Sequence, residues 1–392
     1  MVRTLKIKRG GKADTMDFSL SKQQEMLRNM VGEFAKLELS PKALELDEKG
    51  KFPLHEVKRA AALGLLGIVN SKKYGGAEMG HLARVIAIEE VSKAYPPLGF
   101  FLQVGAIGMY ILEMEGTEEQ KGKYLPDLCK AEKIMATALT EATGGSDTAA
   151  LQSTARVDGD GYILNGRKVY ISFVEAADLV CVVAKTDDKF NAFMVERGTP
   201  GFEISRRERH EGLRSIPVNE FALTNCRIPK ANLVGQEGKG LGVTMNGIAV
   251  MGRMGAASVG LGVAQGCYEI ALKFAKERKL YGKRVADLQA IQFMLVDIST
   301  GIEAARILTY KAGWLLDQGK SPREAGVDIA RAKLCACDLA TDVAFKTVRI
   351  LGGAGTTPEY QVTRRLRDAL ELLPAAGTQE IMKVVIGGSI TR

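Results

Sequence analysis

The pattern of apolar residues changes twice along the chain, and these changes constrain the fold more than any single motif. Residues 17 to about 135 repeat apolar residues at three- and four-residue spacing, as in "FSLSKQQEMLRNMVGEFAKLEL", which is typical of amphipathic helices. From residue 136 to about 238, short alternating runs surround Asp-Gly and Asn-Gly pairs, as in "LQSTARVDGDGYILNGRKVYIS", and predict β-hairpins. Long helical periods then return. The order predicts a mainly α protein with a central β-domain.

We expect four segments from this order: a basic arm over residues 1–15, an N-terminal helical domain over 16–135, a β-barrel or sandwich over 136–238, and a C-terminal helical bundle over 239–392. The bundle helices are longer than a solitary domain needs, which favours packing against other subunits. The glycine-rich run "GRMGAASVGLG" has no strand before it, so it predicts close helix packing rather than a nucleotide loop.

The charge balance favours a small anionic ligand. The net charge is +8, but the basic residues are scattered and aromatics are only 6%, which argues against nucleic acid. By eye along the sequence, we expect no membrane span, because no apolar run approaches the roughly 18–20 residues that one needs. The basic N-terminus lacks the apolar stretch of a secretory signal. Six cysteines without C-x-x-C spacing and three scattered histidines predict no metal site. We therefore expect a cytoplasmic protein.

Four segments carry most of the chemistry: "LTEATGGSD" (139–147), "RKVYISFVEAAD" (167–178), "ERKLYGK" (277–283) and "ILGGAGTTPEY" (350–360). In this order and spacing they resemble the acyl-CoA dehydrogenase family, and the similarity covers the chain from about residue 16. The resemblance implies a helical domain, a central β-domain and a C-terminal four-helix bundle. It also implies FAD, assembly as a homotetramer, and electron-transferring flavoprotein as partner.

The resemblance places the flavin ring against the first two segments. Leu139 and Thr140 would approach the flavin through their backbone, and Tyr170 would cover it. Ser172 stands where a Thr usually donates its hydroxyl to flavin N5, and Ser keeps that donor. Phe173 departs from the family, which commonly has Asn there.

A second group would face the rest of the FAD. Arg278 would reach the pyrophosphate of a neighbouring subunit's cofactor, because a fixed cation suits a phosphate. The other positions that the resemblance brings to the cofactor are Gln289, Arg349, Gly352, Gly353, Thr378 and Glu380, the last two near the adenosine. Leu280 replaces a usual hydroxyl residue, and Arg349 stands where Gln is usual.

The catalytic base of the family has no counterpart here. Counted from "RDA" to "GT", the position of the usual glutamate is Ala376. A minority of the family carries its base just before the residue that matches Arg253, and that position is Gly252, in a segment one residue longer than usual. The backbone N–H of Ala376 would still polarise a thioester carbonyl. The sequence thus predicts an enzyme that binds and acidifies an acyl-CoA but takes no proton from the usual side.

The acyl pocket should be lined from "AYPPLGFFLQVG" (94–105). Phe100 and Gln103 would form its wall, although a Phe pair on a helix fits plain core equally well. The resemblance adds Ser146 and Arg253 as residues near CoA or the active-site wall. Two groups remain as substitute bases, Tyr95 and Glu371, and a tyrosine with its usual pKa of about 10 is a poor one.

Three function classes stay open at this point. The first is an FAD-dependent dehydrogenase or reductase of a cyclic or otherwise unusual acyl-CoA. The second comprises a desulfinase or a flavin monooxygenase of the same fold. The third is a flavoprotein without catalytic activity.

Overall fold

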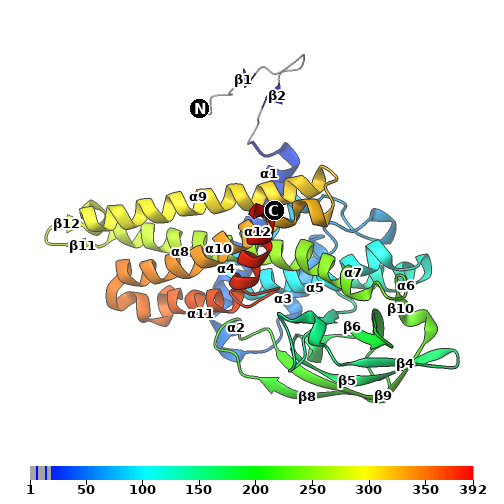
Figure 1. Ribbon diagram of the computed structural model, residues 1–392. Helices are drawn as coiled ribbons and strands as arrows, with labels where there is room; N and C mark the ends of the chain where they lie inside the picture. The colour runs from blue at the N-terminus through cyan, green and yellow to red at the C-terminus, as the bar shows by residue number, and fades with distance from the viewer. Residues whose placement is uncertain (1–5, 8–13, 16–18, 392) are drawn as a thin grey trace.

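Helices cover one side of a sheet domain in the computed structural model (Figure 1), which describes residues 6–7, 14–15 and 19–391. The arm predicted over residues 1–15 lies outside the described residues, apart from the short strands β1 (Lys6–Ile7) and β2 (Asp14–Thr15).

The N-terminal block is helical, as predicted. Its helices are α1 (Lys22–Phe34), α2 (Ala43–Lys49), α3 (Leu54–Ala62), α4 (His81–Ala94), α5 (Pro96–Glu115) and α6 (Glu118–Cys129). Ser21 and Thr117 form capping boxes at the starts of α1 and α6, and Pro96 begins α5, where a missing N–H costs no helical hydrogen bond. Helices α4 and α5 are almost entirely buried.

The middle block forms an eight-stranded sheet. Its strands are β3 (Met135–Ala138), β4 (Thr154–Asp158), β5 (Gly161–Ser172), β6 (Leu179–Thr186), β7 (Lys189–Glu196), β8 (Phe202–Glu208), β9 (Val218–Pro229) and β10 (Leu233–Val234). The order is β10-β7-β6-β4-β5-β9-β8, and β3 runs parallel to β6. Tyr162 of β5 lies 4.9 Å from Phe193 of β7, ring centre to ring centre, although two strands separate β5 from β7. The sheet therefore curls over its own core, and the central β-domain is confirmed.

One of the two hairpin predictions is wrong. The Asp158-Gly159 pair does end β4 at a turn, because Asp158 is paired with Gly161 in β5. The Asn165-Gly166 pair instead lies inside β5, where the register with β9 shifts. A side chain at Gly166 would collide with Ser153, so this glycine permits a close strand contact rather than a turn.

The C-terminal block returns to helices: α7 (Gly240–Gly247), a π-helical turn (Ile248–Arg253), α8 (Met254–Glu277), α9 (Gln289–Asp317), α10 (Pro322–Leu351), α11 (Val362–Leu372) and α12 (Gln379–Ile390), with a small hairpin of β11 (Lys279–Leu280) and β12 (Lys283–Arg284). The glycine-rich run in α8 packs closely, as predicted: a Cβ at Gly260 would lie 2.8 Å from the carbonyl oxygen of Ala336 in α10. Asp317 at the end of α9 accepts the His81 and Leu82 N–H groups, so it caps α4.

Two helices correct the expectation about apolar runs. By length and hydropathy, α5 and the continuous helix over 240–277 could each cross a membrane. Inside the fold, however, 72% of the apolar window in α5 and 94% of that in the longer helix are buried. Both are therefore explained as core helices of this fold.

Candidate functional site

The end of β3 meets the middle of β5 and forms the first wall of the site. The N–H of Val169 donates to the carbonyl of Thr140 at 3.1 Å. None of the hydrogen bonds among the described residues uses the N–H of Leu139 or of Thr140, so both are free to bind a ligand. Tyr170 sits in a register shift of β5 with a φ of 56°, and its side chain is 62% exposed. The bulge thus presents an aromatic ring beside two free donors.

A buried ion pair holds this wall in place. Lys168 of β5 is fully buried; its Nζ donates to the Leu139 carbonyl at 3.0 Å and to Glu141 Oε1 at 2.7 Å. Glu141 also accepts the N–H groups of Gln152 and Ser153. Burial alone would raise the pKa of Glu141, but these hydrogen bonds outweigh it and hold the pKa below its usual range. The carboxylate therefore stays charged opposite Lys168.

Ser172 ends β5 and is half-buried beside Phe173. Phe173 has a φ of 47° and is fully buried, with its ring centre 5.1 Å from that of Phe101. Phe52 completes this aromatic cluster. Of the Phe pair in α5, Phe101 is therefore core, and Phe100 is buried as well.

The turn between α11 and α12 carries the position of the usual base. Ala376 has a φ of 56°, and Arg253 Nε donates to its carbonyl at 3.2 Å. A Cβ placed on Gly252 would lie 3.0 Å from Ala376 Cβ, so the two positions that could hold a base face each other. None of the hydrogen bonds among the described residues uses the Ala376 N–H.

A second cation, Lys333, binds the same turn from the side of α10. Lys333 of α10 is fully buried, and its Nζ donates to the carbonyls of Leu373 and Gly377 and to Gln379 Oε1, at 2.8, 2.9 and 2.7 Å. Thr378 caps α12 through the Ile381 N–H. The turn is therefore anchored on both sides although it presents no reactive side chain.

The two substitute bases are both engaged elsewhere. The hydroxyl of Tyr95 is hydrogen-bonded to Ser215, and burial raises its pKa far above the usual value. Glu371 accepts from His210 Nδ1 at 2.9 Å and from the Gly212 N–H at 3.2 Å. Neither arrangement leaves an effective proton acceptor at the turn.

Most of the residues expected at the distal part of the cofactor lie at the ends of the long helices next to the β11–β12 hairpin (Figure 1), whereas Thr378 and Glu380 lie at the start of α12. Arg278 and Gly353 line a cleft of about 530 Å³ together with Phe274 and Tyr360. Three further positions expected at the cofactor, Gln289, Arg349 and Gly352, are exposed at the nearby ends of α9 and α10. Ser146 and Glu380 are exposed outside this cleft, on the loop after β3 and at the start of α12.

Sequence reasoning missed three charged residues: Lys168, Lys333 and Arg84. Lys168 and Lys333 are fully buried, and Arg84 is almost fully buried. Arg84 donates to the carbonyls of Val250 and Met251, in the π-helical turn that carries Gly252. A lysine or arginine on the inward face of a strand or helix was the available signal, since such residues are almost never buried without a partner.

Models of acyl-CoA dehydrogenase domains match three consecutive parts of the chain: the N-terminal domain at residues 21–132, the middle domain at 136–226 and the C-terminal domain at 238–391. The chain therefore belongs to the acyl-CoA dehydrogenase family. Its activity class is that of an FAD-dependent oxidoreductase acting on CH–CH bonds of acyl-CoA thioesters.

Individual relatives match over nearly their whole length. The short-chain specific acyl-CoA dehydrogenase of Clostridium acetobutylicum is 40% identical, over 96% of this chain and 100% of the relative. A caffeyl-CoA reductase–Etf complex subunit of Acetobacterium woodii is 36% identical, over 95% and 99%. The structure of butyryl-CoA dehydrogenase from Megasphaera elsdenii superimposes with a TM-score of 0.92 at 34% identity, over 96% and 100%.

The residues present fit an FAD. The free N–H groups at Leu139 and Thr140 suit the polar edge of a flavin, and the exposed ring of Tyr170 lies beside them. The cleft at Arg278 offers a fixed cation and glycine backbone for phosphate. Among the described residues, no cluster of His, Cys, Asp and Glu could hold a metal ion.

Proposed function

We propose that this oxidoreductase works on an unusual acyl-CoA without a carboxylate at either usual base position. The contact between Ala376 and Gly252 carries the proposal. A Cβ on Gly252 would lie 3.0 Å from Ala376 Cβ, so the two positions meet but offer only a methyl group and a hydrogen atom. A positioned general base is worth roughly 10²–10⁴-fold in rate. A straight-chain saturated acyl-CoA is therefore a poor substrate, and a cyclic or otherwise unusual acyl group a better one.

The turn keeps a backbone donor for the thioester carbonyl although it lacks a base. The Ala376 N–H is free to donate to the thioester carbonyl oxygen, which makes the neighbouring carbon more acidic. Arg253 and Lys333 hold the Ala376 and Gly377 carbonyls, so this donor is fixed in direction before substrate arrives. Preorganisation of this kind costs nothing at the moment of reaction.

Cofactor binding is assigned to the residues of the first wall of the site and of the cleft at Arg278. Leu139, Thr140, Tyr170 and Ser172 would hold the flavin ring of one subunit's FAD, and Arg278 with Gly353 would hold the distal part of a neighbour's. When bound, FAD supplies the acceptor or donor of a hydride. Gln289, Arg349, Gly352, Thr378 and Glu380 keep the cofactor roles that the family resemblance gives them.

We also propose a homotetramer in the cytoplasm that exchanges electrons with an electron-transferring flavoprotein. The caffeyl-CoA reductase relative is named as part of such a complex, which supports the partner. Arg278 follows the last residue of α8, whereas Arg253, which donates to the Ala376 carbonyl, precedes the first; this separation by the length of α8 supports a cofactor shared between subunits.

The test is anaerobic flavin reduction by butyryl-CoA in the native protein and in Ala376→Glu. The new carboxylate should raise the rate by up to about 10²–10⁴-fold, or less if burial raises its pKa too far. Ala375→Glu is the matched control, because it adds the same charge one residue away and should give no gain.

Three outcomes separate the alternatives. Fast reduction by the native protein means that a base exists elsewhere and refutes the empty base position. Loss of sulfite from sulfinoacyl-CoA, or oxygen transfer by the reduced protein, would replace the proposal with the desulfinase or the monooxygenase. A flavin that no linear, branched or cyclic acyl-CoA bleaches would leave the non-catalytic flavoprotein.

A further inference from the structure

We infer that the acyl group of the substrate carries a carboxylate, bound beside the empty base position by Arg253 and Gln103. This inference rests on the proposed function, because it assigns the substrate class of the same site. It starts from two buried polar side chains whose bonding is incomplete.

Arg253 is a buried cation without a counter-ion. Its side chain is 8% exposed, and its one hydrogen bond among the described residues runs from Nε to the Ala376 carbonyl. No carboxylate of the described residues pairs with either terminal nitrogen. Burial lowers the pKa of Arg253, and no acidic group opposes this effect.

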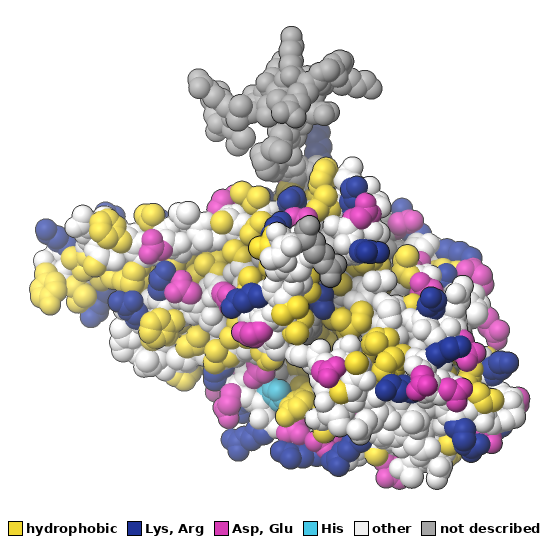
Figure 2. Space-filling model, in the orientation of Figure 1, with side chains coloured by type: hydrophobic (Ala, Val, Ile, Leu, Met, Phe, Trp, Pro, Cys, Tyr) yellow, Lys and Arg dark blue, Asp and Glu magenta, His cyan; other side chains and the backbone are white. Residues whose placement is uncertain are grey.

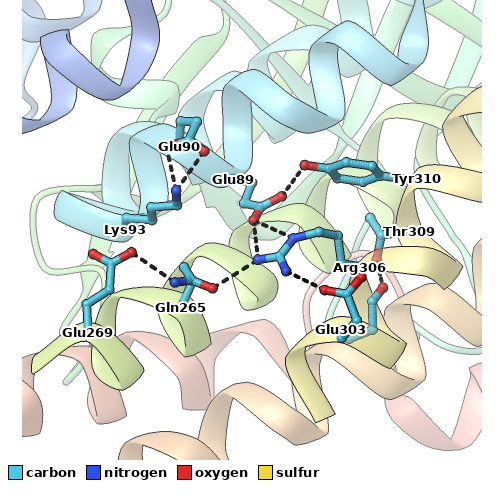
Figure 3. Close-up of polar contacts among 10 residues, drawn as sticks. Glu89, Glu90, Lys93, Gln265, Glu269, Glu303, Arg306, Thr309 and Tyr310 are labelled. Atoms are coloured by element: carbon cyan, nitrogen blue, oxygen red, sulfur yellow. Dashed lines mark hydrogen bonds and ion pairs between the residues drawn. The ribbon is translucent and has the colours of Figure 1, made fainter. Parts of the chain in front are cut away.

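Arg306 shows how a buried arginine in the same protein is paired with a carboxylate (Figure 3). Its guanidinium donates to Glu89 Oε1 at 3.2 and 3.0 Å and to Gln265, while Tyr310 completes the Glu89 carboxylate. Two other buried arginines, Arg84 and Arg365, touch no carboxylate. Burial lowers the pKa of each to about 10, and the negative charge of Asp317 or Asp368, respectively, opposes this shift. Burying a charge without such compensation is costly, so the anion near Arg253 should come from a ligand.

Gln103 supplies the second observation. This residue of α5 is fully buried, and neither its amide nitrogen nor its amide oxygen has a hydrogen-bond partner. It packs on Gly255, where an added Cβ would lie 2.5 Å from Gln103 Cγ. Gly255 and Gly252 are three residues apart and share one helix face. The unsatisfied amide thus lies about one helical turn from the Gly252–Ala376 contact.

A carboxylate satisfies both groups. The forked donors of arginine match the two oxygens of a carboxylate, and the Gln103 amide N–H₂ can donate to the same group. The absence of a protein carboxylate at 376 follows from the same logic, because two carboxylates in one pocket would repel each other. The substrate then brings the negative charge that most of the family keeps on the protein.

The experiment compares pairs of CoA thioesters that differ in one charge. Binding of succinyl-CoA and glutaryl-CoA to the FAD-loaded protein would be measured by titration calorimetry against butyryl-CoA and valeryl-CoA. We expect the charged member of each pair to bind about 10–100-fold more tightly, the range for hydrogen bonds to a charged group. Arg253→Met and Ala376→Glu should each abolish this preference, while the exposed Arg323→Met should preserve it.

A second variant covers the case in which Arg253→Met does not fold. Gln103→Glu places a negative charge in the subsite, and it should weaken the dicarboxylic thioesters at least tenfold more than the uncharged ones. Equal binding of charged and uncharged thioesters by the native protein overturns the inference and leaves the proposed function standing. Binding of neither kind overturns the proposed function, and the inference with it.

Discussion

Lys333 keeps the turn at 373–378 in shape although the turn has lost its reactive side chain. Lys333→Met would remove the donor from three oxygen acceptors that are buried or partly buried, and each group left unsatisfied costs up to about 1–3 kcal/mol. We expect a lower melting temperature and weaker acyl-CoA binding, because the Ala376 N–H loses its fixed direction. Lys346→Met on the same helix is the control, since Lys346 pairs with the half-exposed Asp342. Equal effects of the two substitutions would disprove the anchoring role.

The His210–Glu371 pair makes stability depend on pH. The hydrogen bond to Glu371 raises the pKa of His210 above its usual value of about 6.5. A raised folded-state pKa contributes stability that is complete below about pH 6.5 and is lost as pH rises through the folded-state pKa. Glu371→Gln should therefore have a lower free energy of unfolding than the native protein at pH 6, by at most about 1 kcal/mol. At high pH the two proteins should have the same stability. Melting curves that differ equally at both pH values would contradict this assignment.

At the residue scale, the sequence located the turn but not its supports. Ala376 could be placed by counting along the chain, because helix and turn lengths are local quantities. The partners of Lys168 and Lys333 could not, since Glu141 and Gln379 lie 27 and 46 residues away. Such pairings depend on how β3 meets β5 and how α10 passes under the turn, which are properties of the folded chain. The cofactor roles of Leu139, Ser172 and the other site residues stay predictions.

At the element scale, a π-helical turn spans Ile248–Arg253, in the segment that the sequence predicts to be one residue longer than is usual in the family. A π turn holds one more residue than the α-helical ladder allows and is frequent at functional sites. Here it brings Gly252 against Ala376 and points the Val250 and Met251 carbonyls at Arg84.

Arg84 should therefore act on the site from a distance. Arg84→Met removes both donors and should destabilise the protein by about 1–3 kcal/mol for each carbonyl left unsatisfied. Arg84→Lys keeps one donor and should recover part of the loss. If the π turn positions Arg253, acyl-CoA affinity should fall in Arg84→Met and return in Arg84→Lys, while FAD content stays unchanged. A loss of melting temperature without any change in acyl-CoA affinity would limit Arg84 to a structural role.

Element types followed from periodicity, whereas two details did not. The Asn165-Gly166 pair looks like a turn because the sequence shows its backbone freedom and not the neighbour, Ser153, that needs the space. The parallel pairing of β3 with β6 joins segments separated by the whole β4–β5 hairpin, and no local pattern specifies it.

At the scale of the whole molecule, the long helices next to the β11–β12 hairpin, and the hairpin itself, expose apolar side chains (Figures 1 and 2). On α9 these include Phe293, Val296 and Trp314, each at least half exposed, and Tyr281 in the hairpin is 95% exposed. Large exposed apolar side chains such as these mark an interface where they gather into a patch. These exposed apolar side chains support the proposed tetramer. The segment boundaries at residues 136 and 239 stay predictions.

Assembly and cofactor binding should be coupled through Arg278. Arg278→Ala should lower both the FAD content and the fraction of tetramer, because a cofactor held between subunits stabilises their association. Absorbance ratios and sedimentation measure the two quantities on one sample. Arg284→Ala is the control, since this exposed arginine lies in the adjoining hairpin and donates to Asp287. Full flavin occupancy in Arg278→Ala would show that the residue serves no neighbour.

The buried position of α5 has a consequence for synthesis of the protein. Gly99, Gln103 and Ile107 of α5 pack against residues between Gly252 and Val259, which leave the ribosome about 150 residues later. At about 5–20 residues per second, an apolar segment of membrane-span character waits roughly 10–30 s for its partner. During that interval the nascent chain presents α5 to chaperones and to the membrane-insertion machinery. Chains that end before residue 277 should therefore depend on chaperones or aggregate.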